Sequence, residues 1–239
     1  MNIAVVFAGG VGKRMSNSAI PKQFLSIGDK PIIIRTLEIF EECDQIDKII
    51  LVMVESHINY MKKLIKKFEI KKIEDVVPGG DTGQLSIYNG LRRADKIPSS
   101  DKKIVLIHDG VRPFISERLI RENIESVIKY GSAISCVKQN ETVVQVDCTN
   151  NVLSAGDRES AYIAKAPQSF YLDDILGAHT LMIQNNKINN IDSCTLMLSC
   201  NKKLHVIECD YSNIKITTPT DYYFAKALIE AKENIDIFG

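Results

Sequence analysis

The chain lacks an excess of either charge, because its 30 Lys and Arg are balanced by 30 Asp and Glu over 239 residues. This balance argues against a nucleic-acid-binding protein, whose footprint is a strong basic excess. No apolar run approaches the roughly 20 residues of a membrane-spanning helix, so we expect no membrane span. The content of 45% hydrophobic and 25% charged residues is instead typical of a globular protein with a substantial core.

Paired cysteines and a targeting segment are also missing. The six cysteines form no C-x-x-C pair and are scattered through apolar segments, which favours buried free thiols over a zinc site or disulfides. An apolar strand begins almost at Met1, without the basic segment and cleavage site of a secretory signal. Together these absences predict a cytoplasmic protein.

Strand and helix patterns alternate along most of the chain, which predicts an α/β fold. Such alternation implies right-handed βαβ units and a mostly parallel sheet flanked by helices. No linker is evident, so we expect a single domain over 1–239. The expected strands are 3–7, 48–54, 74–77, 103–107 and 204–208, and the expected helices are 31–42, 57–68, 84–95, 117–130, 172–184, 193–200 and 220–233.

The segment from about 132 to 165 interrupts this alternation. Ala133 to Val137 and Thr142 to Val146 are short and β-branched, and no helix separates them. We expect them to pair as an antiparallel hairpin. One interpretation is a protruding β-arm that packs against a second subunit, and the other is an edge hairpin of the main sheet.

A glycine-rich loop follows the first strand. Ile3 to Phe7 leads directly into Ala8-Gly9-Gly10-Val11-Gly12-Lys13-Arg14-Met15, and Pro21-Lys22-Gln23 comes soon after. Glycines let backbone N–H groups approach a ligand closely, and Arg14 and Lys22 add two cations. This combination suits the triphosphate of a nucleotide. The alternative is a glycine-rich surface turn with solvated cations.

Three common nucleotide signatures are absent from the sequence. A Walker A loop needs Ser or Thr after its Lys, but Lys13 is followed by Arg14. A dinucleotide fingerprint needs a third glycine where Met15 stands. No D-x-D triplet is present, which disfavours a glycosyltransferase that uses a nucleotide sugar.

A carboxylate follows the strand at 103–107, in the motif His108-Asp109-Gly110-Val111-Arg112-Pro113. Ligands of parallel sheets lie beyond the carboxyl ends of the strands. With a triphosphate already inferred, Asp109 predicts a Mg²⁺ ligand, because Mg²⁺ binds one or two carboxylates together with phosphate oxygens. Arg112 would then face a second anion. The alternative is a turn that caps the following helix.

Two further motifs lie on loops. Gly79-Gly80-Asp81-Thr82-Gly83-Gln84-Leu85-Ser86 precedes a helix and is expected either to contact a nucleotide base or to supply the helix N-cap through Asp81 or Thr82. Lys215, in Asn213-Ile214-Lys215-Ile216-Thr217, is expected either to be exposed or to reach an α-phosphate. Arg158 and the turn Ala166-Pro167-Gln168 complete the set.

These motifs, taken in order, resemble those of the cytidylyltransferases of small polyol phosphates across nearly the whole chain. The resemblance implies a Rossmann-like domain with a dimerising β-arm, and a Mg²⁺-dependent transfer of CMP from CTP to a polyol phosphate with release of pyrophosphate. Two branches are close, one acting on 2-C-methyl-D-erythritol 4-phosphate and the other on D-ribitol 5-phosphate.

The family's roles transfer by motif onto this sequence. Arg14 and Lys22 would bind the triphosphate beside the loop of Ala8, Gly9, Gly10 and Gly12, while Lys215 would steady the α-phosphate and Asp109 would hold Mg²⁺. The cytosine would be contacted by Gly80, Asp81 and Ser86. The polyol phosphate would be bound by Arg112, Thr142 and Arg158, the last two contributed across a homodimer.

The branch is indicated by a few residues. Ala8-Gly9-Gly10, Pro21 to Phe24 and Val111 to Phe114 resemble the ribitol branch, which predicts D-ribitol 5-phosphate as the acceptor and a role in making a surface polymer. The methylerythritol enzyme of isoprenoid synthesis is the alternative. Gly83 and Ala166 stand where the family has Arg and Thr, which leaves another polyol or sugar phosphate open. A non-catalytic nucleotide-binding scaffold is disfavoured, because Arg14, Lys22, Asp109 and Lys215 are retained together.

Overall fold

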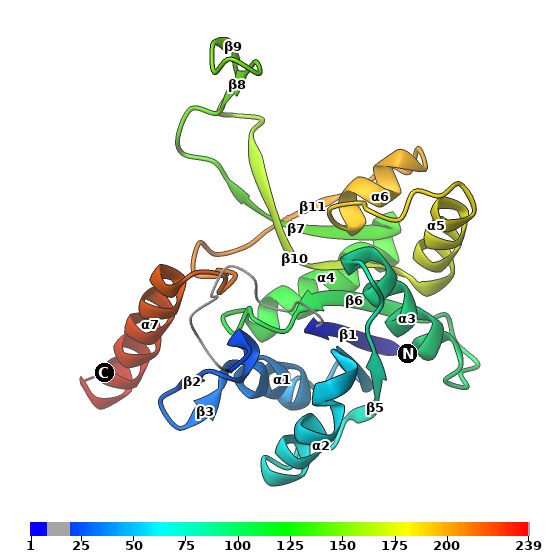
Figure 1. Ribbon diagram of the computed structural model, residues 1–239, viewed down its shortest axis with the longest axis vertical. Coiled ribbons are helices and arrows are strands. Elements are labelled where there is room, and N and C mark those ends of the chain that lie inside the picture. The colour runs from blue at the N-terminus through cyan, green and yellow to red at the C-terminus, as the bar shows by residue number, and fades with distance from the viewer. Residues whose placement is uncertain (9–19, 239) are drawn as a thin grey trace.

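A seven-stranded sheet forms the centre of the molecule (Figure 1). The computed structural model describes residues 1–8 and 20–238, with side chains up to residue 231. The strand order is β11-β7-β10-β6-β1-β4-β5, and all neighbours are parallel except the pairs that involve β10. The expected α/β fold with a mostly parallel sheet is therefore confirmed. The strands are β1 (Asn2–Ala8), β4 (Lys48–Met53), β5 (Ile73–Pro78), β6 (Ile104–Asp109), β7 (Ser132–Lys138), β10 (Tyr162–Tyr171) and β11 (Val206–Glu208).

Helices cover both faces of the sheet and enclose two apolar cores. Along β1, Ala4 and Val6 face the core beneath α1, α2 and α4, while Ile3 and Val5 face the core beneath α3, α5 and α6. This alternation follows from the period of two in a strand, and burial on both faces explains the continuous apolar sequence of β1. The helices are α1 (Ile32–Glu42), α2 (Ile58–Lys67), α3 (Gly83–Asp95), α4 (Glu117–Tyr130), α5 (Leu172–Gln184), α6 (Ser193–Ser199) and α7 (Pro219–Phe238).

The hairpin expected between 133–137 and 142–146 does not form. β7 lies inside the main sheet, parallel to β11 and antiparallel to β10, and all its residues but the last are buried. The segment that projects from the sheet in Figure 1 begins beyond β7 and returns through the first part of β10. Its tip carries β8 (Val144–Val146) paired with β9 (Val152–Ala155). This burial on both faces explains why most residues of β7 are small or apolar.

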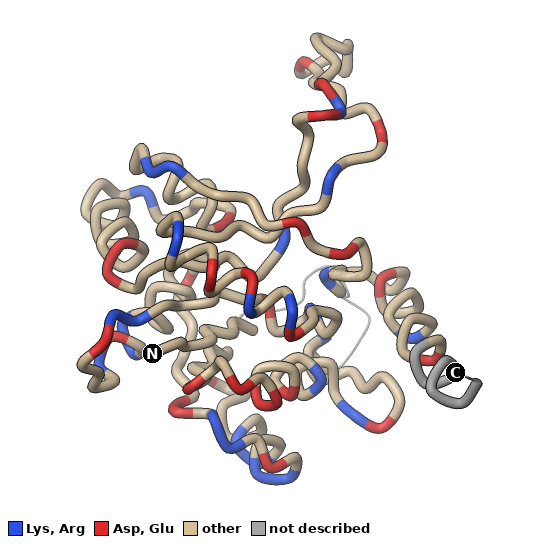
Figure 2. Tube along the Cα trace, turned by 180° about the vertical axis from the view of Figure 1, so that it is seen from behind, with Lys and Arg blue, Asp and Glu red and all other residues tan. Residues whose placement is uncertain are grey.

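Smaller elements border the site or connect the main ones. They are η2 (Lys22–Phe24), β2 (Ser26–Ile27), β3 (Lys30–Pro31) and η3 (Glu55–His57). On α2, Met61 and Leu64 are buried, whereas the run of lysines is exposed, as the sequence pattern predicted. Figure 2 marks the lysines of the chain in blue. None of the described helices is both long and apolar enough to cross a membrane.

Candidate active site

Two cavities meet at the carboxyl ends of β1 and β6. These strands are adjacent and in register, with Phe7 opposite Asp109. One cavity has a volume of about 210 Å³ and the other of about 120 Å³, and both are lined by Phe7, Asp109 and Lys215. The larger cavity extends toward Arg112 and α6, and the smaller one toward Ala8 and Lys22. The arrangement offers two adjoining compartments on either side of one carboxylate and one ammonium group.

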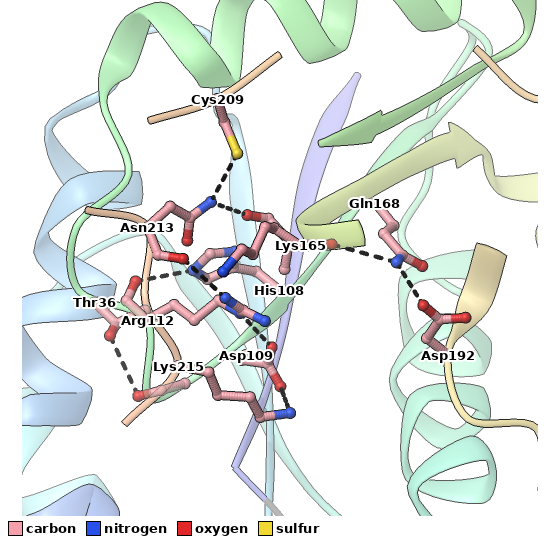
Figure 3. Close-up of polar contacts among 12 residues, drawn as sticks. Thr36, His108, Asp109, Arg112, Lys165, Gln168, Asp192, Cys209, Asn213 and Lys215 are labelled. Atoms are coloured by element: carbon pink, nitrogen blue, oxygen red, sulfur yellow. Dashed lines mark hydrogen bonds and ion pairs between the residues drawn. The ribbon is translucent and has the colours of Figure 1, made fainter. Parts of the chain in front are cut away.

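Asp109 is the electrostatic centre of this region (Figure 3). It is only 5% exposed, and its two oxygens accept from Lys215 Nζ at 2.6 Å and Arg112 Nε at 2.7 Å. Burial by itself raises the pKa of the Asp109 carboxyl, but the charges of Lys215 and Arg112 outweigh it and hold that pKa below its usual value. The carboxylate therefore stays ionised at neutral pH.

Backbone contacts hold the two cations in place. Arg112 Nη1 donates to the carbonyl oxygen of Asn213 at 3.0 Å, and the amide of Ile216 donates to Val111 at 3.0 Å. Asn213 Nδ2 donates in turn to the carbonyl oxygen of Ala166 at 2.7 Å. The segment that carries Lys215 is thereby fixed against both β6 and β10.

His108 supports the turn after β6 rather than a helix. Its Nε2 lies 3.1 Å from the carbonyl oxygen of Arg112, and complete burial lowers its pKa to about 4, so the ring is neutral. The N-cap of α4 is Ser116, whose hydroxyl accepts from the amide of Leu119. The alternative in which His108 or Asp109 caps that helix is therefore wrong.

The smaller cavity holds the described part of the predicted phosphate loop. Ala8 ends β1, and Lys22 begins the short helix η2. Gln23 is buried and donates from Nε2 to the carbonyl oxygen of Ala8 at 3.2 Å, which ties η2 to the end of β1. Gly9, Gly10, Gly12 and Arg14 lie outside the described residues.

The loop before α3 is held by its own hydroxyl groups. Thr82 is the N-cap of α3 and accepts from the amide of Leu85 at 3.1 Å. Ser86 Oγ accepts from the amide of Gly80 at 3.0 Å and donates to the carbonyl oxygen of Thr82 at 2.9 Å. A Cβ on Gly80 would lie 2.6 Å from the Cβ of Leu85, so this close approach requires glycine. Gly80, Asp81 and Ser86 line neither cavity.

Thr142 and Arg158 lie together on the projecting segment. Arg158 donates to Thr142 Oγ1 from Nε at 2.9 Å and from Nη2 at 2.6 Å, and both residues are exposed. Within the described chain no contact joins them to Asp109 or Arg112. The structure thus brings two of the predicted acceptor residues to each other but not to the third.

Two residues near the larger cavity were not assigned a role by the sequence patterns. Asn213 links the Lys215 segment to β10, and its only sequence signal is its place as the first residue of that lysine's motif. Asp192 caps α6 by accepting from the amide of Thr195 at 2.8 Å and also accepts from Gln168 Nε2 at 3.0 Å. An Asp before a short helical pattern is a cap signal, but its place beside the cavity depends on the fold.

The residues present fit a metal site in which the protein supplies few of the ligands. No group of three His, Cys, Asp or Glu side chains suited to a metal occurs in the part of the chain that the structure describes. A Mg²⁺ ion bound mainly by nucleotide phosphates needs only one or two carboxylates, and Asp109 supplies one at the junction of the cavities.

Comparison with known proteins places these features in a family. The family model described as IspD, 2-C-methyl-D-erythritol 4-phosphate cytidylyltransferase, matches residues 2–231. The chain is 48% identical to a ribitol-5-phosphate cytidylyltransferase of Streptococcus agalactiae serotype V, covering 100% of this chain and 99% of that protein. It is 38% identical to a 2-C-methyl-D-erythritol 4-phosphate cytidylyltransferase of Clostridium botulinum, covering 96% of this chain and 97% of that protein.

A solved structure agrees with these sequence relatives. The 4-diphosphocytidyl-2C-methyl-D-erythritol synthase of Anaerococcus prevotii superimposes with a TM-score of 0.83 at 28% identity, covering 96% of each chain. The same α/β architecture therefore accompanies the sequence match. The chain belongs to the IspD family of cytidylyltransferases and is a nucleotidyltransferase.

Proposed function

We propose that this enzyme transfers CMP from CTP to D-ribitol 5-phosphate and releases CDP-ribitol and pyrophosphate. The observation that carries the reaction is the pair of cavities on either side of Asp109 and Lys215, which suits two phosphate-bearing substrates. The choice of acceptor is supported by the 48% identity to a ribitol-5-phosphate enzyme, against 38% to a methylerythritol enzyme.

The chemistry requires no general base. An oxygen of the acceptor's phosphate attacks the α-phosphorus of CTP, a new P–O bond forms, and the bond from the α-phosphorus to the bridging oxygen breaks. The second pKa of a phosphomonoester is about 6, so the attacking oxygen is already deprotonated at neutral pH. Catalysis then consists of holding two anions in line and stabilising the charge on the departing pyrophosphate.

The basic residues of the smaller cavity suit the triphosphate. Lys22 lines this cavity beside Ala8, where the backbone enters the loop of Gly9, Gly10 and Gly12. We assign Lys22 and Arg14 to the β- and γ-phosphates and to the leaving pyrophosphate. Lys215 is 42% exposed at its side chain and borders both cavities, which supports its assignment to the α-phosphate.

We assign Asp109 to Mg²⁺ when the nucleotide is bound. A bound Mg²⁺ would neutralise phosphate charge and favour departure of pyrophosphate. Lys215 forms an ion pair with Asp109 Oδ1. If the Lys215 side chain turned to pair with the α-phosphate instead, that oxygen would become free for a metal. Arg112 would remain on Oδ2 and keep the carboxylate oriented.

The remaining roles concern the base and the acceptor. We assign Gly80, Asp81 and Ser86 to the cytosine, since their loop precedes α3 close to the sheet edge. We assign Arg112 to the polyol phosphate together with Thr142 and Arg158 of a second copy. This would explain why the latter two lie on an exposed projection, remote from Arg112 in their own chain.

A homodimer formed through the projecting segment is part of this proposal. Several of its apolar side chains are 41% to 67% exposed, which favours burial against another surface. They are Val143, Val144, Val146, Val152, Leu153, Tyr162 and Ile163. We further infer a cytoplasmic location, because all six cysteines are free thiols, as is usual in a reducing compartment.

Pyrophosphate release tests the function. The enzyme is mixed with CTP and Mg²⁺ and offered D-ribitol 5-phosphate, 2-C-methyl-D-erythritol 4-phosphate and neighbouring polyol phosphates. We expect the largest kcat/KM with D-ribitol 5-phosphate. Turnover of methylerythritol phosphate alone would instead support the second candidate, which the IspD family model favours. Calorimetric binding of CTP without release from any acceptor would indicate a non-catalytic protein.

A further inference from the structure

Polar residues with no role in the steps above line the larger cavity. Besides Asp109, Arg112 and Lys215, its wall includes Lys165 from β10 and Ser193 from the first turn of α6. The three cations among them converge on one space of about 210 Å³. Both additional side chains are poorly satisfied by the protein itself, which suggests that a ligand completes them.

Lys165 is a half-buried cation that forms no ion pair with any residue the structure describes. Asp109 is already engaged by Arg112 and Lys215, and Asp192 by Gln168 and the N-terminus of α6. Among the described residues, no carboxylate pairs with Lys165. Burial lowers the pKa of its ammonium group, and the nearby charge of Arg112 lowers it further. A bound anion would offset both unfavourable effects.

The backbone around Lys165 is held in place by the active-site segment. The carbonyl oxygen of Asn213 accepts a hydrogen bond from Arg112. The side-chain amide of Asn213 donates to the carbonyl oxygen of Ala166, the residue next to Lys165. Gln168 Nε2 also donates to the carbonyl oxygen of Lys165 at 3.3 Å. Figure 3 shows Asn213 between the strand that carries Lys165 and the cluster around Asp109. The lysine is therefore positioned by the same residue that positions Arg112.

Ser193 presents an unused hydroxyl to the same cavity. The residue is 3% exposed, and its Oγ has no hydrogen-bond partner among the described residues. Leaving a buried polar group unpaired costs free energy, so such groups are generally paired with protein, water or ligand. A hydroxyl can donate or accept, which matches the hydroxyl groups of a polyol chain.

We propose that Lys165 and Ser193 determine acceptor specificity, with the Lys165 ammonium binding the acceptor's phosphate beside Arg112 and the Ser193 hydroxyl binding a hydroxyl of the polyol chain. This inference rests on the proposed transfer to a polyol phosphate. The acceptor's phosphate must approach the α-phosphorus, which is assigned to Lys215, and Lys215 and Lys165 line the same cavity. The ligand class is thus a phosphorylated linear polyol.

The first test replaces Lys165 by an uncharged side chain of similar length. Loss of a charge-assisted contact to phosphate should raise the KM for D-ribitol 5-phosphate in K165M by about 10-fold to 100-fold. The KM for CTP should stay within about 2-fold, since Lys165 does not line the cavity of Lys22. K165R should recover part of the loss, and K203M, at an exposed lysine, is the matched control.

The second test removes the hydroxyl of Ser193. S193A should raise the KM for D-ribitol 5-phosphate by about 5-fold, the effect of one neutral hydrogen bond. Its matched control is S199A, which removes an exposed hydroxyl at the other end of the same helix. Wild-type acceptor KM values in both K165M and S193A would overturn the inference.

A chemical measurement on the wild-type protein does not depend on turnover or on the variants folding. An amine-reactive reagent should modify Lys165, and D-ribitol 5-phosphate should slow that modification while unphosphorylated ribitol does not, as followed by peptide mass spectrometry. Equal labelling with and without the phosphate would contradict the inference. A wild-type enzyme that releases no pyrophosphate would instead overturn the proposed function, so the two failures are distinguishable.

Discussion

The edge of the sheet and the projecting segment carry the two halves of the proposed acceptor site, and the chain holds them very differently. At the sheet edge, Asp109 and Arg112 are 5% and 8% exposed and each has defined partners on other elements. On the projection, Arg158 and Thr142 contact mainly each other, and almost every residue from 139 to 160 is exposed.

The difference teaches how each region obtains its structure. Buried charges are stable only when their partners are all in place, so the sheet edge is fixed by the fold of one chain. Exposed polar pairs contribute little to stability, because water can hydrogen-bond to the same groups when the pair is broken. The projection therefore gains its order from β8 pairing with β9 and, in our proposal, from a second copy.

The largest effect should come from breaking the sheet-edge cluster. In D109N, the buried Arg112 loses its counter-charge, so we expect unfolding free energy to fall by about 3 kcal/mol. Turnover should fall by about 100-fold or more, because a preorganised charge is lost at the reacting phosphates. Urea unfolding and pyrophosphate release measure the two effects.

The matched control for that variant is D174N, which breaks an exposed ion pair with Lys202. It should alter stability by less than about 1 kcal/mol and leave turnover unchanged. Turnover of D109N within a few-fold of wild type would contradict the assignment of Asp109.

Mixing two inactive variants tests whether the projection serves the partner. D109N and R158A are each expected to be impaired, but a mixed dimer would contain one site with neither change. Random reassortment should place intact machinery in about a quarter of all sites. Pyrophosphate release is measured after the two proteins are unfolded, mixed and refolded together, beside each variant treated alone.

No gain on mixing, with mixed dimers shown to form, would mean that Arg158 does not act across subunits. A double variant that carries both changes is the second control. In a mixed dimer of this double variant with wild type, each of the two sites would carry one of the changes, so no intact site should form beyond those of the wild-type homodimer.

The buried His179 gives a prediction of a smaller effect, on the pH dependence of stability. Burial lowers the pKa of His179 to about 4, and both of its ring nitrogens lack hydrogen-bond partners among the described residues. Because the folded-state pKa lies below the unfolded value of about 6.5, stability is retained above pH 6.5 and is lost as the pH falls toward 4.

Replacing His179 by Phe keeps an aromatic ring stacked near Tyr88 while removing the titration. H179F should lose about 2 kcal/mol less unfolding free energy than wild type between pH 7 and pH 5. Urea titrations at the two pH values measure this difference. The same pH dependence in H179F and wild type would mean that His179 binds a proton equally well in the folded and unfolded states.

The smallest effect is expected on the projection. Glu159 pairs with Lys138 at 2.7 Å, but its side chain is 81% exposed. E159Q should therefore leave the midpoint of urea unfolding unchanged. A loss comparable to that of D109N would remove the contrast between the two regions.

The fold was largely predictable because local patterns and tertiary burial agree. The helix expected at 117–130 forms with those bounds, because Ser116 caps it, Gly131 ends it and its apolar residues face one core. The predicted pairing of 133–137 with 142–146 was wrong because β-branched sequence indicates a strand but not its partner. The antiparallel partner of β7 is β10, which begins more than twenty residues later, and its parallel partner is β11.

The candidate site was predictable to a similar degree. Motifs pointed to Asp109, Arg112 and Lys215 one by one, and their ion pairs form where the turn after β6 meets the loop that carries Lys215. Lys165 and Ser193 carried no such signal, since a lysine and a serine are usually exposed. Their assignment to the acceptor site depends on burial beside the cavity, which arises only because β10 and α6 lie at its wall.

The sequence by itself determined the alternation of strands and helices, the motifs that we assign to phosphate binding, and the family, because periodicity and motif spacing are properties of the chain. Only the tertiary structure decided that β7 belongs to the main sheet, that one carboxylate joins two cavities, and that Arg158 lies apart from Arg112. The physical reason is that pairing partners, burial and the field around a charge are set by residues distant in sequence, which only the folded chain brings together.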